Sequence, residues 1–324
     1  MHVPRRSPLP RVSGSTPGAS DATLDILLPF YGDPGYLRTA VESVLAQDDP
    51  RWTLTVIDDR YPGTEHTAYL ESLDDPRVRH LVNETNLGVS RNFQHATDLA
   101  TADYSVIFGG DDVMLPGYVS RVRQLIATHP GADVIQPGVQ VIDEQGTPVL
   151  PLADRVKANY RPKGAGPQVL TGEPLASSLM RGLWTYFPSV VWKTSTLKRY
   201  GFTAQFEVSL DATLLLDIAL GGGVLVADDE VVFQYRRHRA SVSSATAVDG
   251  SRFAEERAFF ADADRLCREK GWPRAARIAR RHLSSRLNAV SQLPRAIAGG
   301  DGAGVRALLR HTVARTGAHV RIDA

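Results

Sequence analysis

Three acidic positions have residue types suited to phosphate or metal chemistry. The pairs Asp58-Asp59 and Asp111-Asp112 each follow a short apolar run, and Asp211 opens a run of apolar residues. A hard divalent cation held by one or two carboxylates can neutralise charge on a phosphate group. A further carboxylate can accept the proton of an attacking hydroxyl. Taken alone, the second pair also fits a turn or a helix cap, so its context matters.

The elements expected around these residues alternate between strand and helix in the first 130 residues. Four such alternations predict a mainly parallel sheet covered by helices on both faces. In sheets of this kind ligands bind beyond the carboxyl ends of the strands, and Tyr31 and both acidic pairs come directly after a predicted strand. The predicted strands are 24–30, 52–57, 77–82 and 104–108, and the predicted helices are 36–47, 88–100 and 116–129.

The rest of the chain has a less regular pattern. Residues 132–193 read as short strands with a Gly/Pro-rich loop at 161–167. A helix at 210–220 and strands at 224–227 and 231–235 follow, and the chain then reads as helical from residue 251, with breaks near 271–273 and 299–304. We therefore expect a disordered tail at 1–21, an α/β domain at 22–245 and a helical extension at 246–324.

Length and composition fit an ordinary globular protein. The chain has 324 residues, of which 43% are hydrophobic and 23% charged. Its single cysteine, Cys267, excludes an internal disulfide framework and any multi-cysteine zinc site. The sequence has no apolar run of about 20 residues that could span a bilayer, and residues 1–20 lack the apolar core of a signal peptide. A cytoplasmic location is the expectation.

The charge is distributed unevenly along the chain. Residues 265–324 contain 13 Lys or Arg and three acids, so this end carries +10 and the remainder −9 of the net +1. A basic end can contact phosphate, a membrane surface or nucleic acid, or it can simply present solvated Arg-rich helix faces. Trp272 is the only aromatic residue after Phe260, which disfavours nucleic acid. We expect no nucleic-acid partner and leave peripheral contact with the inner membrane face open.

An ordered set of segments resembles the family 2 glycosyltransferases over about residues 24–240. The segments occur in the order and at the spacing of that family. They are LDILLPFY at 24–31, YLRTAVESVLAQ at 36–47, LTVIDD at 54–59, NETNLGVSRN at 83–92, ATADY at 100–104 and GDDVMLP at 110–116. The resemblance implies a GT-A fold for residues 22–245. It also implies inverting transfer of a sugar from a nucleotide-sugar donor, UDP- or dTDP-linked, to a hydroxyl acceptor.

The resemblance also assigns roles around the donor nucleotide. Pro29 and Tyr31 would line the pocket for the base and ribose, and Asp59 would accept a hydrogen bond from a pyrimidine ring. Arg91 stands where the family often places a residue that contacts the base or the phosphates.

For the metal, the resemblance assigns Asp111 and Asp112, with Asp112 the favoured direct ligand of Mn²⁺ or Mg²⁺. Asp111 would also face the nucleotide. Many members carry a further Asp where this chain has Gly109. His238, in the segment YRRHRASVS at 235–243, could help to hold the metal or the diphosphate, and the neighbouring Arg236, Arg237 or Arg239 could pair with phosphate oxygens.

Asp211 matches the family position of the catalytic base. An acid that opens a helix is favoured in its ionised form by the helix dipole, as a resting base requires. The surroundings depart from the family, because Leu210 stands where Glu is common and Asp217 where Arg is frequent. A plain helix-capping role stays open for Asp211, and Glu207 is the nearest substitute.

Trp184 and Tyr186 are acceptor-site candidates, because aromatic faces stack on sugars, although such rings fill protein cores more often. The acceptor could belong to a glycan, a lipid-linked compound or a natural-product intermediate. The sequence does not specify the sugar, the linkage or the oligomeric state.

Other classes of protein fit less well. The first strand is followed by PFYGDP and not by the G-x-G-x-x-G of dinucleotide-binding enzymes, and the P-loop motif is absent. A sugar nucleotidyltransferase should carry a Gly-rich loop with Arg or Lys after its first strand, and this loop is missing. A nucleotide-sugar-binding protein that has lost catalysis stays open, because of Gly109 and the altered surroundings of Asp211.

Overall fold

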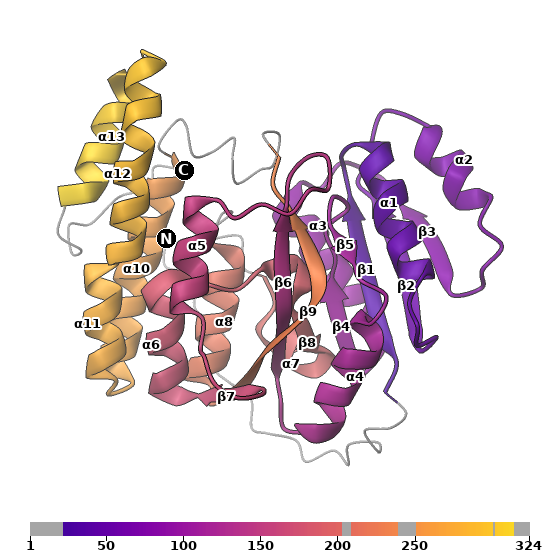
Figure 1. The fold of residues 1–324 in the computed structure, drawn as a ribbon, viewed down its shortest axis with the longest axis horizontal. Helices are drawn as coiled ribbons and strands as arrows, with labels where there is room; N and C mark the ends of the chain where they lie inside the picture. Colours follow the sequence, from indigo (N-terminus) through magenta and orange to yellow (C-terminus); the bar gives the residue numbers. More distant parts are fainter. Residues whose placement is uncertain (1–21, 203–208, 239–250, 301, 314–324) are drawn as a thin grey trace.

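The computed structural model describes residues 22–202, 209–238, 251–300 and 302–313. The predicted tail at 1–21 and the predicted boundary near residue 245 lie outside these ranges and stay predictions. At the broadest level the structure is a mixed sheet with helices on both faces, extended at one end by a group of helices (Figure 1).

The first four long strands are parallel and lie side by side in the order β3-β2-β1-β4. They are β1 (Leu24–Phe30), β2 (Trp52–Asp58), β3 (Val78–Val82) and β4 (Tyr104–Ile107), connected by α1 (Pro34–Leu45), α2 (Glu65–Glu71) and α3 (Val89–Leu99). Strands β1 and β4 are almost continuously apolar because both of their faces are covered. Helix α1 starts two residues before the predicted position 36, with Pro34 in its first turn and the Asp33 carboxylate accepting from the backbone N–H groups of Gly35 and Tyr36.

The sheet continues beyond β4 with mixed strand directions. Strand β8 (Val191–Lys193) pairs antiparallel with β4 and with β6 (Val134–Ile142), which runs parallel to β9 (Val224–Arg236). Two short strands, β5 (Val113–Met114) and β7 (Gln168–Thr171), pair antiparallel with β9. The helices and the 3-10 turn of this half are α4 (Tyr118–Thr128), α5 (Leu152–Tyr160), α6 (Gly172–Gly182), η1 (Phe187–Ser189), α7 (Thr194–Tyr200) and α8 (Leu210–Leu220).

Two predictions for this half were wrong. The expected strands 224–227 and 231–235 are one strand, β9, whose register against β6 shifts around Gly138. A Cβ at Gly138 would lie 2.4 Å from the Glu230 carbonyl oxygen, so only glycine permits this close approach. Residues 132–193 also contain the helices α5 and α6, not only short strands. Long-range packing of α6 against α8 and α11 stabilises α6, which local sequence patterns do not reveal.

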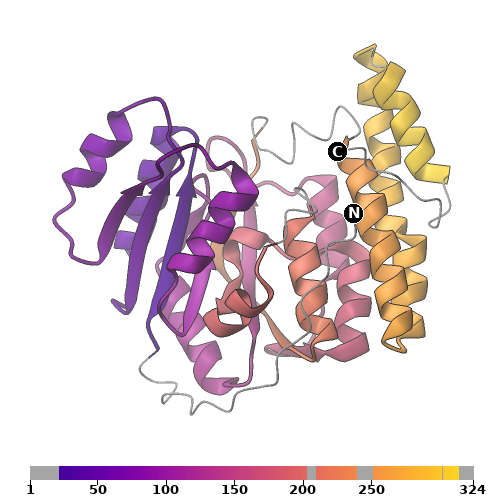
Figure 2. The ribbon, with the colours of Figure 1, turned by 180° about the vertical axis from the view of Figure 1, so that it is seen from behind.

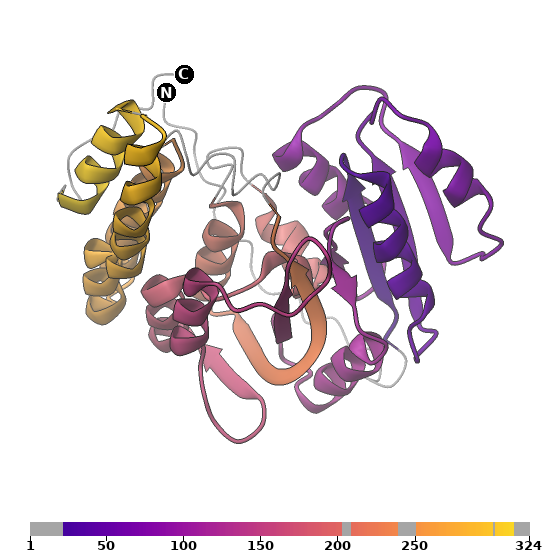
Figure 3. The same ribbon diagram turned by 45° about the horizontal axis from the view of Figure 1, so that its top comes forward.

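Four helices follow β9 in the described chain: α10 (Ser251–Glu269), α11 (Pro273–Arg281), α12 (Leu283–Ala298) and α13 (Gly302–Val313). Figures 2 and 3 show them grouped at the end of the molecule opposite β3 and α2. Helices α10 and α11 share a hydrophobic core with α6 and α8, which includes Phe260, Cys267 and Ala276. The helical extension is therefore built onto the α/β domain. Within the described residues, no helix is long and apolar enough to cross a membrane.

Candidate active site

Asp112 is held inside the protein at the turn between β4 and β5. Its side chain is almost fully buried, and its Oδ1 accepts a hydrogen bond of 2.8 Å from the backbone N–H of Arg236 in β9. Its Oδ2 is buried without a hydrogen-bond partner. Burial raises the pKa of Asp112 well above its usual value, and the neighbouring charge of Asp111 adds to this rise.

Asp111 is more exposed and faces a histidine. Its Oδ2 lies 2.7 Å from Nε2 of His238, which follows β9. The hydrogen bond to Asp111 raises the pKa of His238 above its usual value. Arg236 ties the same turn to β9, because its Nε donates to the Asp111 carbonyl oxygen at 2.8 Å. Segments more than 120 residues apart thus converge on one carboxylate and one imidazole.

Asp111 and His238 could hold a divalent cation between them. A carboxylate and an imidazole already face each other, and a second carboxylate oxygen, Asp112 Oδ2, lacks a partner although it is buried. Carboxylates suit Mg²⁺ and Mn²⁺, and imidazole is tolerated by Mn²⁺. Of the two acids, Asp111 is the accessible one, whereas the sequence favoured Asp112 as the direct ligand.

Gly109 has a steric role in this turn. A Cβ at this position would lie 2.6 Å from Asp112 Oδ2 and 3.0 Å from Asp111 Oδ1. The two carboxylates therefore occupy the space that a side chain at residue 109 would need. The acid that many family members carry at this position could not be added here without moving both carboxylates.

Asp59, directly after β2, is buried, and its carboxylate accepts hydrogen bonds from the loop that follows β3. Its Oδ1 accepts from Asn83 Nδ2 at 2.8 Å and from the Leu87 N–H at 2.7 Å, and its Oδ2 accepts from the Gly88 N–H at 2.9 Å. Asn83 also donates to Asn92 at 3.1 Å. The sequence did not predict this internal role, although NETNLG at 83–88 has the polar and glycine residues of a tight turn.

The other nucleotide candidates are distributed around the same strand ends. Tyr31 is 59% exposed, with its ring edge-on to Tyr61 at a centroid distance of 5.9 Å. Pro29 is half-buried within β1. Arg91 is exposed on α3, and its Nε donates to the Leu87 carbonyl oxygen at 3.0 Å. The open tyrosine ring is available for stacking on a planar group.

Asp211 lies in the first turn of α8, as predicted. Burial raises its pKa above the usual value and outweighs the opposing effects of Lys157 and of backbone N–H groups at the helix start. The expected stabilisation of the ionised form by the helix start is therefore present but not dominant. Burial also lowers the pKa of Lys157 to about 8. A carboxyl group with a raised pKa can accept a proton more readily, as a general base must.

A cleft of about 440 Å³ lies between α5, β6 and the segment that precedes η1. Trp184 and Tyr186 line it, although both rings are largely buried. Lys157 also lines the cleft, and its Nζ donates to the Thr185 carbonyl oxygen at 3.0 Å. Because Lys157 acts electrostatically on Asp211, the cleft and the candidate base are close to each other.

A buried ion pair supports this cleft. Asp154 accepts two hydrogen bonds from Arg237, at 2.8 and 3.1 Å, and a third from the Tyr186 hydroxyl at 3.0 Å. Arg237 therefore pairs with Asp154, whereas the sequence analysis considers it as a phosphate ligand. Sequence reasoning missed Asp154 and Lys157, because no local pattern connects Asp154 to a partner 83 residues away. The further candidates Glu207 and Arg239 lie outside the described residues.

Comparisons with known proteins agree with this arrangement. Residues 25–181 match the model of glycosyl transferase family 2. Almost half of the chain is thus similar to this family. Among curated relatives, the putative glycosyltransferase EpsE of Bacillus subtilis is 28% identical over 138 residues, which are 41% of this chain and 49% of EpsE. The uncharacterized protein y4gI of Sinorhizobium fredii is 31% identical over 142 residues, which are 43% of this chain and 15% of y4gI. The match to this chain thus spans less than half of either relative.

Solved structures share the fold of this chain. S. aureus TarS 1–349 in complex with UDP-GlcNAc has a TM-score of 0.64 at 16% identity, with 90% of this chain and 81% of that chain covered. The mannosyltransferase PcManGT from Pyrobaculum calidifontis, in complex with GDP-Man and Mn²⁺, has a TM-score of 0.59 at 16% identity, with 91% and 81% covered. At this identity the similarity establishes the GT-A fold of the chain.

Proposed function

We propose that the protein transfers a sugar from a nucleoside-diphosphate sugar to a hydroxyl group of its acceptor, with inversion at the anomeric carbon. The observation that carries this proposal is the convergence of Asp111 and His238, 2.7 Å apart, at the carboxyl end of a parallel sheet. The match of residues 25–181 to the family 2 model supports it, as do structural neighbours in complex with UDP-GlcNAc or with GDP-Man and Mn²⁺.

Asp111 and His238 would hold a divalent cation, Mn²⁺ or Mg²⁺, and Asp112 would support them from behind. Asp112 is tied to the Arg236 N–H and is buried, which suits a supporting role better than the direct one. A bound cation would supply charge neutralisation for the departing nucleoside diphosphate.

The donor base would lie against Tyr31 and Pro29, with Arg91 at the rim. Each oxygen of the Asp59 carboxylate can accept about two hydrogen bonds, and Oδ2 has only one internal donor. One acceptor position is thus left for an N–H of the base, which favours the pyrimidine of UDP or dTDP. Asp59 would also fix the loop at 83–88 before the donor arrives.

Asp211 would remove the proton of the acceptor hydroxyl. The acceptor oxygen forms a bond to the anomeric carbon while the bond to the diphosphate oxygen breaks, so the proton moves to Asp211 and the negative charge to the leaving group. Lys157, which acts on Asp211 electrostatically, would moderate the pKa of this base. The acceptor, a glycan, a lipid-linked compound or a natural-product intermediate, would enter through the cleft beside Trp184 and Tyr186.

The donor can be identified by thermal stabilisation. A bound ligand raises the apparent stability of the folded state, so the protein is heated with a panel of nucleotide sugars in the presence of Mn²⁺ or a chelator. We expect the largest Mn²⁺-dependent rise in Tm with a UDP- or dTDP-sugar. A larger rise with a purine donor would contradict the base assignment. Two other outcomes would favour alternative functions. If wild type and Asp211→Asn both bind a donor and neither turns it over, the protein is a catalytically impaired binding protein. If it releases diphosphate from a nucleoside triphosphate, it is a sugar nucleotidyltransferase.

The outer side of α12 supports a membrane-associated version of this function. Its exposed apolar side chains recur at helical spacing along one face: Leu283, Leu287, Val290 and Ile297. Between residues 273 and 313 the sequence has eight Arg and a single acid, Asp301. We propose that this face contacts an anionic membrane surface at the inner side of the cytoplasmic membrane. A second copy of the chain is disfavoured as the partner, because it would bring like charges together.

Vesicle sedimentation tests this contact. Wild type is expected to sediment with vesicles that contain phosphatidylglycerol and not with pure phosphatidylcholine. Leu287→Glu should weaken this binding several-fold, whereas Val169→Glu, at an exposed position of β7, should not. Equal binding by both variants, or a concentration-dependent dimer in light scattering, would contradict the proposal.

A further inference from the structure

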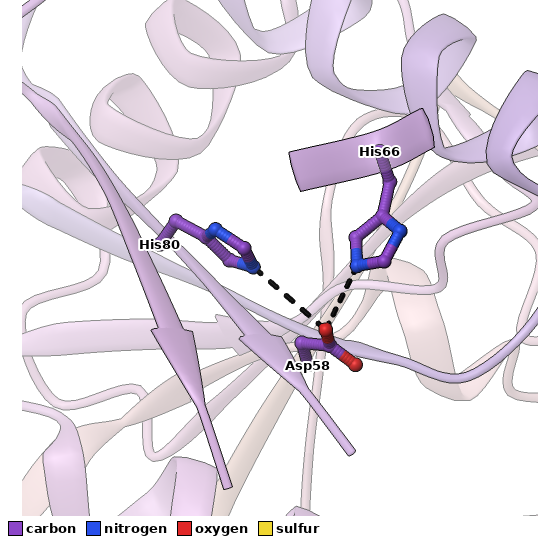
Figure 4. Close-up of side chains that lie close together, drawn as sticks. All are labelled: Asp58, His66 and His80. Carbon is purple, nitrogen blue, oxygen red and sulfur yellow. Dashed lines mark hydrogen bonds and ion pairs between the residues drawn. The ribbon is translucent and has the colours of Figure 1, made fainter. Parts of the chain in front are cut away.

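The edge of the sheet remote from the C-terminal helices carries a second cluster of ligand-type side chains. In the parallel pairing of β2 and β3, Val56 lies opposite His80. Asp58 is two residues beyond Val56 and so points to the same face as His80. Helix α2 lies over this face and contributes His66 from its first turn. Figure 4 shows the three side chains turned toward one another.

The ligand atoms of these residues converge. Asp58 Oδ2 lies 2.8 Å from His66 Nε2 and 4.0 Å from His80 Nε2, and all three atoms are within 4.8 Å of one another. Among the residues that the structure describes, this is the group of three His, Cys, Asp or Glu side chains whose ligand atoms are close enough to share an ion. Asp58 and His66 are buried, and His80 is largely covered.

Part of the cluster lacks hydrogen-bond partners. His80 Nε2 is buried without a partner, and so is His66 Nδ1. Buried polar atoms in native proteins are nearly always paired, so each exception needs an explanation. A hydrogen bond between His66 and Asp58 satisfies those two atoms but leaves His80 Nε2 pointing at the same carboxylate oxygen from too far away. A cation between Asp58 Oδ2, His66 Nε2 and His80 Nε2 would give His80 Nε2 a partner; His66 Nδ1 is on the other side of its ring and is not part of this argument.

We propose that Asp58, His66 and His80 form a metal centre separate from the donor cation site, with Zn²⁺ as the preferred ion. Two imidazoles and one carboxylate suit Zn²⁺, with water as a fourth ligand, whereas Mg²⁺ prefers oxygen ligands throughout. The centre shares no residue with Asp111 and His238. It does not depend on the proposed transferase activity.

The centre would have a structural role on the donor side of the sheet, where it would hold three elements together. It would link α2 to β3, which is the edge strand, and to the end of β2. Strand β3 leads directly into Asn83, which donates to Asp59, the residue next to Asp58. Metal binding should therefore raise the unfolding temperature and stabilise the loop at 83–88.

Metal binding to the purified full chain tests the centre. The protein is stripped with a chelator and titrated with Zn²⁺ by equilibrium dialysis, and with Co²⁺ by visible absorption, which reports tetrahedral coordination. The variant Asp111→Asn/His238→Ala is used to remove the donor cation site. We expect this variant to retain one Zn²⁺ and to gain thermal stability on binding it.

The ligand variants are His80→Gln and His66→Gln, and His95→Gln on α3 is the matched control. In the background without the donor cation site, each ligand variant should weaken Zn²⁺ binding at least about tenfold, and the control should not change it. His80 is at the sheet edge and is partly exposed, so its variant stays informative if loss of the more buried His66 impairs folding. Absence of Zn²⁺ binding in this background, or equal binding by His80→Gln and His95→Gln, would overturn the proposal.

Discussion

The proposed donor side and the proposed acceptor side of this protein hold their polar groups in different ways. On the donor side, carboxylates at strand ends are fixed mainly by backbone N–H groups: Asp59 by Leu87 and Gly88, and Asp112 by Arg236. On the acceptor side, Asp154 is fixed by the side chains of Arg237 and Tyr186. Backbone donors come with the fold itself, whereas side-chain partners must be supplied by distant positions in the sequence. The two sides should therefore respond differently to mutation.

The largest effect is expected from the base. Asp211→Asn should lower turnover about 10²- to 10⁴-fold, because the acceptor hydroxyl loses its proton acceptor. Donor binding and the unfolding temperature should change little. Release of nucleoside diphosphate, measured with a saturating donor, checks this, and Asp217→Asn further along α8 is the control. Near-normal turnover by Asp211→Asn would remove this residue from the catalytic machinery.

Asp154→Ala tests the side-chain network of the acceptor side. It leaves the partly exposed Arg237 and the Tyr186 hydroxyl without their partner, so the free energy of unfolding should fall by about 2–3 kcal/mol. Asp229→Ala, which breaks the more exposed pair with Arg161, should cost less than about 1 kcal/mol. Urea denaturation of both variants measures the difference. Equal losses would show that burial of the Asp154 pair has no particular importance.

The C-terminal helices contain two buried histidines, His282 and His311, and should make stability depend on pH. Burial lowers the pKa of His282 and of His311 to about 4, and Arg286 and Arg257 act in the same direction while Glu256 opposes them. The unfolded chain therefore binds more protons than the folded one between pH 6.5 and about 4. The stabilisation is complete above pH 6.5 and is lost as the pH falls through this window.

Denaturation at pH 7 and pH 5 checks this dependence. We expect wild type to lose about 1–2 kcal/mol more than His311→Gln over this interval. An equal loss in both proteins would contradict the assignment of this pH dependence to the buried histidine pair.

A smaller and more local effect is expected from Gly109→Ala on the donor side. The added Cβ would press on the Asp112 carboxylate, so the cation concentration for half-maximal turnover should rise by up to about tenfold. In Gly110→Ala the new Cβ meets nothing closer than 3.4 Å, so this variant is the control. If both variants need the same cation concentration, the steric role of Gly109 is refuted.

The same contrast explains what could be predicted from the sequence. Short apolar runs between helical segments predict buried strands, so the first four parallel strands were predicted, as were the place of Asp211 in the first turn of α8 and those of Asp59 and Asp111 after strand ends. Asp154 and Lys157 were missed, because each acquires its environment from residues far away in the chain. The continuity of β9 was missed because it depends on Gly138 in another strand.

The roles of Arg237 and Gly109 could not be predicted from the sequence for a different reason. The sequence placed Arg237 among phosphate ligands, but a buried carboxylate takes its guanidinium group. It treated Gly109 as a lost acid, whereas the space at this position is already filled by the neighbouring carboxylates. The roles of Asp112, Asp59, Trp184 and Tyr186 in binding stay predictions.

The central claim is that Asp111 and His238 hold the cation on which the donor diphosphate binds. Calorimetric titration of UDP, with and without Mn²⁺, tests it most directly. Wild type should bind UDP at least about tenfold more tightly with Mn²⁺ than without it. Asp111→Asn should lose this dependence, and Asp103→Asn, an exposed control at the other end of β4, should keep it. An unchanged Mn²⁺ dependence in Asp111→Asn would contradict the account.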